Sequence, residues 1–491
     1  MRTPPMALLI LTCVFQLTPA AAQPVTSHPT DWVAHWLAEL KMQSKHQPGP
    51  AASALANLAS AQVAADDLDG LKETLRAWEA SGESVVAPQG YVRFGLLDAW
   101  FYAGETERAK AAIEQILASM AEPKNPSSLD SARGMVARSL LRAGRADEAL
   151  EMAMKVRLRT PQGETRRAWI LAALAERADD ATMAERFWVA ADAAAAEGKT
   201  DRDRWAINKV WVGHDIERIR QQVPSMTPEH QAHILAALAQ YAMKQGNRDF
   251  AVRDARLAYK QLMRDPGAGQ LAWEAVAGAL ARCDDQVTVT AMLERAKKMP
   301  KPKEKPSKEH PGMIPPADPP REYSTISGLA HGYAVAGDAD ATRRHVTQKL
   351  AMLRSGQGKP TNVVWSPADG LIASGHPQAA ADLFDLLPRE LSNPPMDEPQ
   401  RIRALAATGR LDVAFNTLES VSPSYRTMAI GAAAQQLVAD NNFPAADEGI
   451  RLQPPGNRPY STAIAELAKK RRKVPRQHLP APGAATRSTA R

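Results

Sequence analysis

The chain has 491 residues, enough for several globular domains or for one long array of repeats. Hydrophobic residues make up 44% and aromatic residues 5%, and the many alanines favour closely stacked helices over a β-sheet. The formal net charge is +7, but the segment from Lys469 to Arg491 holds eight Lys and Arg and no acid, which leaves the rest at −1. A near-neutral body does not support a basic groove, so we predict no nucleic-acid partner.

The first 22 residues have the features of a secretory signal peptide. Arg2 gives a basic start, residues 6–17 are almost all apolar, and Ala20-Ala21-Ala22 offers a small-residue cleavage site. We predict cleavage after Ala22 and a periplasmic or secreted location. An uncleaved anchor and lipidation at Cys13 are the alternatives. Cleavage would leave Cys283 as the only cysteine, and we expect it to be a buried structural thiol.

The stretch RSLLRAGRADEALEMAMKVRLRTP, residues 138–161, indicates the basic unit of the fold. One helix ends near Ala143, Gly144 supplies a left-handed turn, and a second helix begins near Asp147. Ala149, Ala153 and Val156 lie on one face of that second helix. The unit is therefore a pair of antiparallel helices.

This unit recurs along the chain, after a first helix at 32–43 and before a last one at 460–472. The predicted hairpins are 51–80, 89–120, 127–158, 164–196, 202–223, 228–263, 268–299, 323–353, 363–387, 397–421 and 424–451. Turns recur mostly every 32 to 40 residues, which is typical of a solenoid. We predict an all-α fold, an α-solenoid of about eleven hairpins.

Two segments interrupt or follow the array. Residues 300–320 contain eight of the 37 prolines together with several lysines, so we predict a flexible insertion between array parts at 30–299 and 321–474. Residues 475–491 read as a disordered basic tail, which could contact an anionic surface weakly.

The recurring pattern resembles the tetratricopeptide repeat family. A Gly at the turn, an Ala five residues later, a small residue after seven more and a closing Pro correspond to Gly144, Ala149, Val156 and Pro161. Partial matches are Gly104/Ala109, Gly246/Ala251/Ala258, Gly375/Ala380 and Gly409/Ala414. The family's early Trp and paired Leu-Gly positions are mostly absent. The resemblance implies a right-handed superhelix whose concave wall comes from the first helix of each pair.

No cofactor, metal site or catalytic residue is predicted. His230 and His233 lie three apart, but no further ligand accompanies them, and the carboxylates at 66–69 read as helix capping. We find no phosphate-binding glycine loop, no Gly-x-Ser-x-Gly elbow and no His-Glu-x-x-His motif. The chain is therefore predicted not to be an enzyme.

The leading hypothesis is a non-enzymatic scaffold of the bacterial envelope that binds an unidentified protein or peptide. Counting back from each turn gives the candidate concave residues Tyr91, Phe94, Asp98, Phe101, Arg138, Arg166, Trp169, His233, Gln240, His331, Trp365, Asp369 and Arg403. Some of the aromatic residues among them could instead pack between hairpins. The alternatives are an all-helical enzyme acting on cell-wall glycan or polysaccharide, which a closed ring with paired acids inside would favour, and a structural spacer.

Overall fold

The computed structural model consists of helices joined in pairs by tight turns. It describes residues 31–472 except 47–50, 87–92, 121–125, 158–165, 201, 266, 300–319, 357–362, 389, 392–393, 419–420, 422 and 454–457. The described residues form 24 α-helices and one short 3-10 helix, η1 (Val223–Ser225), and include no β-strand. The predicted all-α class is confirmed. The predicted signal peptide, nearly all of the proline-rich insertion and the basic tail lie outside the described residues.

The turns within ten of the eleven described pairs contain a residue in the left-handed conformation, whereas the predicted turn at Asp179 contains none. At Gly144, with φ of 74°, the backbone N–H of Gly144 donates to the Leu141 carbonyl at 3.0 Å, and the N–H of Arg145 donates to the Leu140 carbonyl at 2.9 Å. These two bonds satisfy carbonyls that the end of the first helix leaves open. Asp284 and Asn441 take the same left-handed conformation, which Asp and Asn tolerate better than most other residues.

Eleven helices come first in their pairs. These first helices are α2 (Ala51–Ala65), α4 (Phe94–Tyr102), α6 (Pro126–Arg142), α8 (Arg166–Ala175), α10 (Arg202–Val212), α12 (Pro228–Lys244), α14 (Gln270–Arg282), α16 (Arg321–Ala336), α18 (Trp365–Ala373), α20 (Pro394–Ala407) and α22 (Pro423–Ala439).

Eleven second helices follow them. They are α3 (Leu68–Ala80), α5 (Thr106–Met120), α7 (Ala146–Met154), α9 (Ala181–Glu197), α11 (Ile216–Gln222), α13 (Arg248–Leu262), α15 (Gln286–Lys298), α17 (Ala339–Arg354), α19 (Pro377–Asp385), α21 (Leu411–Thr417) and α23 (Phe443–Arg451). A single helix stands at each end, α1 (Trp32–His46) and α24 (Tyr460–Arg472). The predicted α-solenoid of about eleven hairpins is confirmed.

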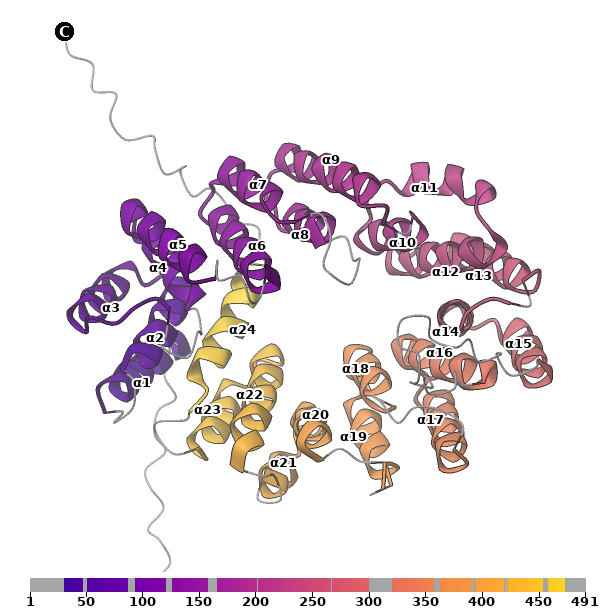
Figure 1. Ribbon diagram of the computed structural model, residues 1–491. Coiled ribbons are helices and arrows are strands. Elements are labelled where there is room, and N and C mark those ends of the chain that lie inside the picture. Colours follow the sequence, from indigo (N-terminus) through magenta and orange to yellow (C-terminus); the bar gives the residue numbers. More distant parts are fainter. Residues whose placement is uncertain are drawn as a thin grey trace, which may run out of the picture.

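The hairpins are arranged in a ring with two layers (Figure 1). First helices pack against the first helices of neighbouring pairs and form the inner layer, and second helices form the outer layer. Buried alanines such as Ala149 and Ala258 let the helices approach closely. The array therefore closes on itself and does not extend as an open superhelix.

Glycines form the seam between α14 and α16, the pairs on either side of the proline-rich segment. A Cβ atom added to Gly328 would lie 2.1 Å from the Glu274 carbonyl oxygen, and one added to Gly332 would lie 2.5 Å from the Gly278 carbonyl oxygen. No ordinary side chain fits at such a distance, so the two backbones touch there. The inner layer consequently continues from α14 to α16 without a break.

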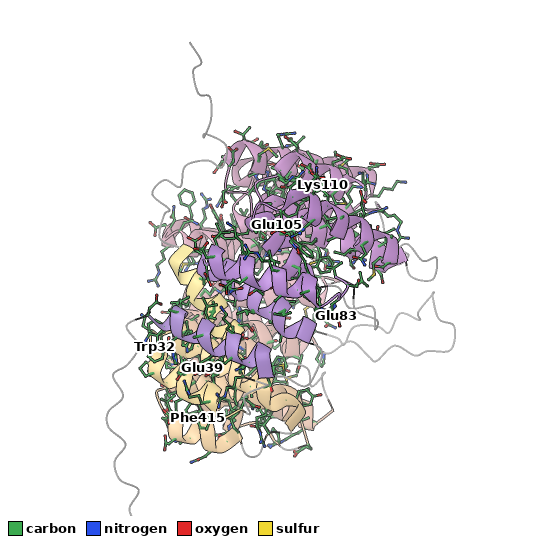
Figure 2. The ribbon with its side chains drawn as sticks, turned by 90° about the vertical axis from the view of Figure 1, so that its left-hand side faces the viewer. Trp32, Glu39, Glu83, Glu105, Lys110 and Phe415 are labelled. Carbon is green, nitrogen blue, oxygen red and sulfur yellow. The ribbon has the colours of Figure 1, made fainter. Side chains whose placement is uncertain are left out.

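Contacts between the two ends of the chain close the ring. Trp36 on α1 is fully buried, and its indole N–H donates to Asp447 of α23 at 3.1 Å. The Phe443 ring lies 6.3 Å from the Trp36 ring, and Arg451 pairs with Glu39 at 3.0 Å. Helix α24 also packs against α1 and α2. Figure 2 shows Trp32 and Glu39 of α1 beside the C-terminal helices.

Cys283 lies just after α14 and is 3% exposed. Burial raises the pKa of its thiol to about 11, so the thiol stays protonated at pH 8. We expect iodoacetamide to alkylate Cys283 slowly in the native protein and quickly in denaturant, because only the thiolate reacts. Mass spectrometry of a Cys13→Ser chain checks this, and fast native alkylation would contradict it. Between pH 9 and 11 the unfolded thiol ionises first, so stability should fall as the pH rises through this range.

Candidate functional site

The exposed faces of the first helices form the inner wall of the ring. In α4, the residues four, five, seven and eight before the turn at Gly104 are all buried, which directs the residue six before the turn, Asp98, away from the core. The structurally equivalent residues are Asp98, Arg138, Gln240, His331, Asp369 and Arg403, all of them predicted from the sequence. Whether they bind a ligand stays a prediction.

Guanidinium groups crowd together on the inner wall at α6 and α8. Arg142 pairs with Asp98 at 2.7 Å, whereas the Nη1 of Arg138 donates only to the Met135 sulfur, at 3.8 Å, among the described residues. The Nε of Arg138 is buried without a hydrogen-bond partner. Burial first, and then the nearby charges of Arg177 and Arg142, lower the pKa of Arg138. This part of the wall therefore has an excess of positive charge that an anionic ligand would relieve.

Several predicted wall residues have packing roles as well. Trp169 meets Trp205 of α10 edge to face at 5.2 Å, and this contact joins the α8 and α10 repeats. Arg166 donates to Ser131 of α6. The half-buried Phe94 and Phe101 pack against the N-terminal core. These contacts hold neighbouring repeats together, so the aromatic residues are at least partly structural.

A second polar group lies on the far side of the ring. The Nη2 of Arg282 on α14 lies 3.0 Å from the Nε2 of His331 on α16, and the Nδ1 of His331 lies 2.7 Å from the hydroxyl of Ser366 on α18. Burial, and then the charge of Arg282, lower the pKa of His331, so the imidazole is neutral near pH 7. Burial also lowers the pKa of Arg282, whose Nε has no hydrogen-bond partner.

The polar line continues through α18, α20 and α22. Arg403 pairs with Asp369 at 2.8 Å and donates to Gln436 at 3.2 Å. The indole N–H of Trp365 donates to Asp397 at 2.7 Å. Each contact crosses from one repeat to the next, so the line both stabilises the inner layer and presents polar groups on it.

The remaining predicted residues contribute less clearly to the inner wall. His233 and Gln240 on α12 are half-buried. Tyr91 lies outside the described residues. His230 lies beside the N-cap of α12, with its Nδ1 2.8 Å from the Thr227 hydroxyl. Across the described ranges, no three His, Cys, Asp or Glu side chains gather as a metal ion would require.

Three carboxylates of the described inner layer have partners on neighbouring repeats. Asp98, Asp369 and Asp397 belong to different repeats, and each accepts a bond from an Arg or a Trp. Glu398 adjoins Asp397 in sequence, and burial raises its pKa. Neighbouring residues on a helix point in different directions, so these two carboxyl groups do not face each other.

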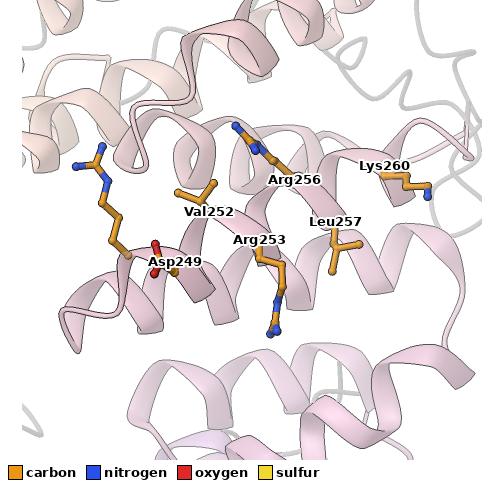
Figure 3. A pocket seen from close by; sticks show the side chains of 7 residues that line it. Asp249, Val252, Arg253, Arg256, Leu257 and Lys260 are labelled. Carbon is orange, nitrogen blue, oxygen red and sulfur yellow. The ribbon is translucent and has the colours of Figure 1, made fainter.

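The outer layer carries a shallow hollow along α13 (Figure 3). Its lining comes from α13 alone and includes Arg253, Arg256 and Lys260. Arg256 is bound to Asp285 at 2.7 Å, and Arg253 lies over the Phe250 ring at 4.5 Å. A surface formed by one helix offers less enclosure than the wall shared by eleven, so the inner wall is the better candidate.

Sequence reasoning missed a second line of wall residues. The residue two before each turn lies one helical turn beyond the predicted one and on the same exposed face. In six successive repeats this residue is aromatic or basic: Tyr102, Arg142, Arg177, Trp211, Lys244 and Arg282. Extending the count from each turn by four residues would have found them.

Comparisons with known proteins give likenesses to solved structures alone. No family model matches the chain. No curated protein matches it either. Among solved structures, the chain is similar to the pentatricopeptide repeat protein PPR10 from maize, with 16% identity and a TM-score of 0.28 over 87% of this chain and 52% of that one. The chain thus spans about half the length of that protein.

The predicted absence of a nucleic-acid partner is wrong as an exclusion, because it rested on the net charge alone. The physical error was to average charge over the whole body. A net charge near zero is compatible with a basic stretch on one wall, such as that of Arg138, Arg142 and Arg177. The chain is a helical-repeat protein of the α-solenoid class.

Proposed function

We propose that the protein is a non-enzymatic scaffold that binds an extended polypeptide segment along the inner wall of its ring. The observation that supports this most is the excess of guanidinium groups on that wall. Arg138 and Arg282 have a buried Nε without a hydrogen-bond partner, and no carboxylate of the described residues pairs with either guanidinium group. Arginine anchors of this kind recur in the hot spots of protein interfaces.

We further propose that the protein acts in the bacterial envelope, after export and cleavage near Ala22. The sequence of the first 22 residues is the support for this proposal. Among the described residues, no helix has both the length and the apolar character needed to cross a bilayer. Cys283, the cysteine that would remain after cleavage, is a free and buried thiol.

An enzyme acting on glycan would require two features of the fold, and one of them is present. The ring is closed, as an all-helical enzyme with a central site would need. The second requirement is a facing pair of carboxyl groups, but Asp98, Asp369 and Asp397 of the inner layer each accept a bond from an Arg or a Trp instead. Ligand binding therefore explains the polar and charged side chains of the inner wall better than catalysis does.

The test compares partner capture by the parent chain and by a triple variant, Arg138→Ala, Arg166→Ala and Arg403→Ala. We expect captured partner to fall about tenfold or more, since losing one hot-spot anchor costs about 1 kcal/mol or more. The Tm should fall modestly, because the bond of Arg166 to Ser131 and the ion pair of Arg403 are lost, and partly exposed ion pairs contribute about 0–1 kcal/mol.

A matched control removes three positive charges from the outer layer instead. Arg76, Arg248 and Arg343 lie on α3, α13 and α17 and are exposed. Their replacement by Ala should leave capture unchanged. Equal capture by the inner variant and the parent would refute the inner wall as the binding surface, and a large fall in Tm would show that these arginines mainly hold the repeats together.

A further inference from the structure

Six successive repeats carry an aromatic or basic residue at one equivalent position, two residues before the turn. We name this set, Tyr102, Arg142, Arg177, Trp211, Lys244 and Arg282, the basic-aromatic stripe. Its members come from α4, α6, α8, α10, α12 and α14, one from each first helix or from the turn that follows it. Because those helices are neighbours in the inner layer, the stripe follows about half of the ring (Figure 1).

The stripe is accessible. Trp211 is 60% exposed and Tyr102 is 37% exposed. The Arg142 side chain is 53% exposed, Arg177 and Lys244 are exposed, and Arg282 is half-buried. Arg177 lies in the turn after α8, and among the described residues its side chain bonds only to the carbonyl of Ala173 in that helix. A tryptophan left this open contributes little to the core.

The fold does not require these residue types. In the repeats of α16, α18, α20 and α22, the equivalent residues are Val335, Ala373, Ala407 and Ala439, and the turns there keep the same geometry. A small apolar residue is therefore sufficient at this position. The large aromatic and basic side chains on one half of the ring need another explanation, and ligand binding supplies one.

Charge on this half of the ring is unbalanced. In the five residues from six to two before each turn, the six helices hold six cationic side chains and two carboxylates, Asp98 and Glu176. Lys209 is one of those cations, but it is buried between Asp192 and Asp215. The corresponding segments of α16 to α22 hold one of each, Arg403 and Asp369, which pair with each other. The stripe thus suits an acidic partner.

We propose that the basic-aromatic stripe binds an extended acidic polypeptide segment with carboxylates at about every third residue. Neighbouring helices pack about 8–10 Å apart, and an extended chain advances about 3.3 Å per residue, so three residues span one repeat. The cations receive carboxylates, and the rings of Tyr102 and Trp211 cover aliphatic stems of the segment. This inference rests on the proposed function and specifies the chemistry of its partner.

The order of residues along the stripe favours a peptide over a single-stranded nucleic acid. Such strands stack successive bases on successive aromatic side chains. Here Tyr102 and Trp211 are separated by two repeats that carry Arg142 and Arg177, so they offer no continuous stacking surface. A peptide with regularly spaced carboxylates fits the basic residues between the two aromatic rings better than a stacked strand does.

The test measures binding of a labelled synthetic peptide, about 18 residues long, with Glu at every third position, to the full chain. We expect saturable binding that weakens with added salt and changes the fluorescence of Trp211. A variant with Trp211→Ala, Arg177→Glu and Lys244→Glu should bind at least about tenfold more weakly. Its circular dichroism should match the parent, because all three side chains are exposed.

Two comparison probes make the result decisive. A peptide of the same composition with its Glu residues contiguous should bind more weakly, and equal binding would overturn the proposed spacing. A thymidine oligonucleotide of equal charge should also bind more weakly, and tighter binding that the stripe variant abolishes would make a nucleic acid the occupant instead. If partner capture survives in the stripe variant but is lost in the Arg138, Arg166 and Arg403 variant, the proposed function stands and the stripe is refuted.

Discussion

Replacing Trp36 by Ala is expected to open the ring and to lower the free energy of unfolding by about 3–5 kcal/mol, the usual cost of removing a fully buried tryptophan. Trp36 is 0% exposed and packs in the core that joins α1 to the C-terminal helices. Its loss would also leave Asp447 without the indole donor that lies 3.1 Å away. The ion pair of Arg451 with Glu39 is partly exposed and contributes only about 0–1 kcal/mol, so the packing of α24 against α1 and α2 is the main closure contact that remains.

Chemical denaturation followed by circular dichroism measures the loss of stability, and small-angle X-ray scattering detects the opening as a larger radius of gyration. Trp211→Ala is the matched control, because the same substitution at a residue that is 60% exposed should change stability by less than about 0.5 kcal/mol. A Trp36→Ala chain with parental stability and scattering would show that other contacts close the ring.

The second large effect is expected at the glycine seam between α14 and α16. A Gly328→Ala chain would place a methyl group 2.1 Å from the Glu274 carbonyl oxygen, closer than any real contact, so the two helices must separate. Such overpacking costs about 1–3 kcal/mol and sometimes more. Gly332→Ala should act similarly through the Gly278 carbonyl oxygen at 2.5 Å, and the two effects should not add, since they share one displacement.

Gly431→Ala provides the control for this seam. Gly431 lies inside α22, and its nearest neighbours would be 3.9 Å from the new Cβ atom. That substitution should be neutral or stabilise the protein by up to about 1 kcal/mol, because Ala favours a helix more than Gly does. Thermal unfolding of the three chains tests the comparison. Equal Tm values for Gly328→Ala and Gly431→Ala would mean that the seam adjusts without cost.

Local features of the fold were predictable from the sequence because they depend on residues close in the chain. The turn residues, mostly Gly and Asp, and the regularly spaced alanines predicted the eleven hairpins. Helices α10 and α12 have the predicted bounds. Other helices are shorter than predicted: α4 begins at Phe94 rather than near residue 89, and α7 ends at Met154 rather than near residue 158. The period of apolar residues alone does not fix the residue at which a helix ends.

The inner wall was predicted in part. Counting back from each turn identified Asp98, Arg138, His331, Asp369 and Arg403, since one helical face is fixed by its distance from the turn. The partners of these residues could not be predicted. Asp98 pairs with a residue of the next repeat, and Arg282 lies against His331 across the proline-rich segment, so both contacts depend on how the repeats stack.

The sequence by itself determined the all-helical class, the pairing of helices and the side of each first helix that faces away from the core, because turn chemistry and a 3.6-residue period act locally. Only the tertiary structure decided that the array closes. Closure is the sum of small rotations between repeats, and it depends on contacts such as Trp36 with Asp447, whose residues are 411 apart in the chain. The same summation brings the basic-aromatic stripe onto one half of the ring, where a net charge averaged over the body had concealed it.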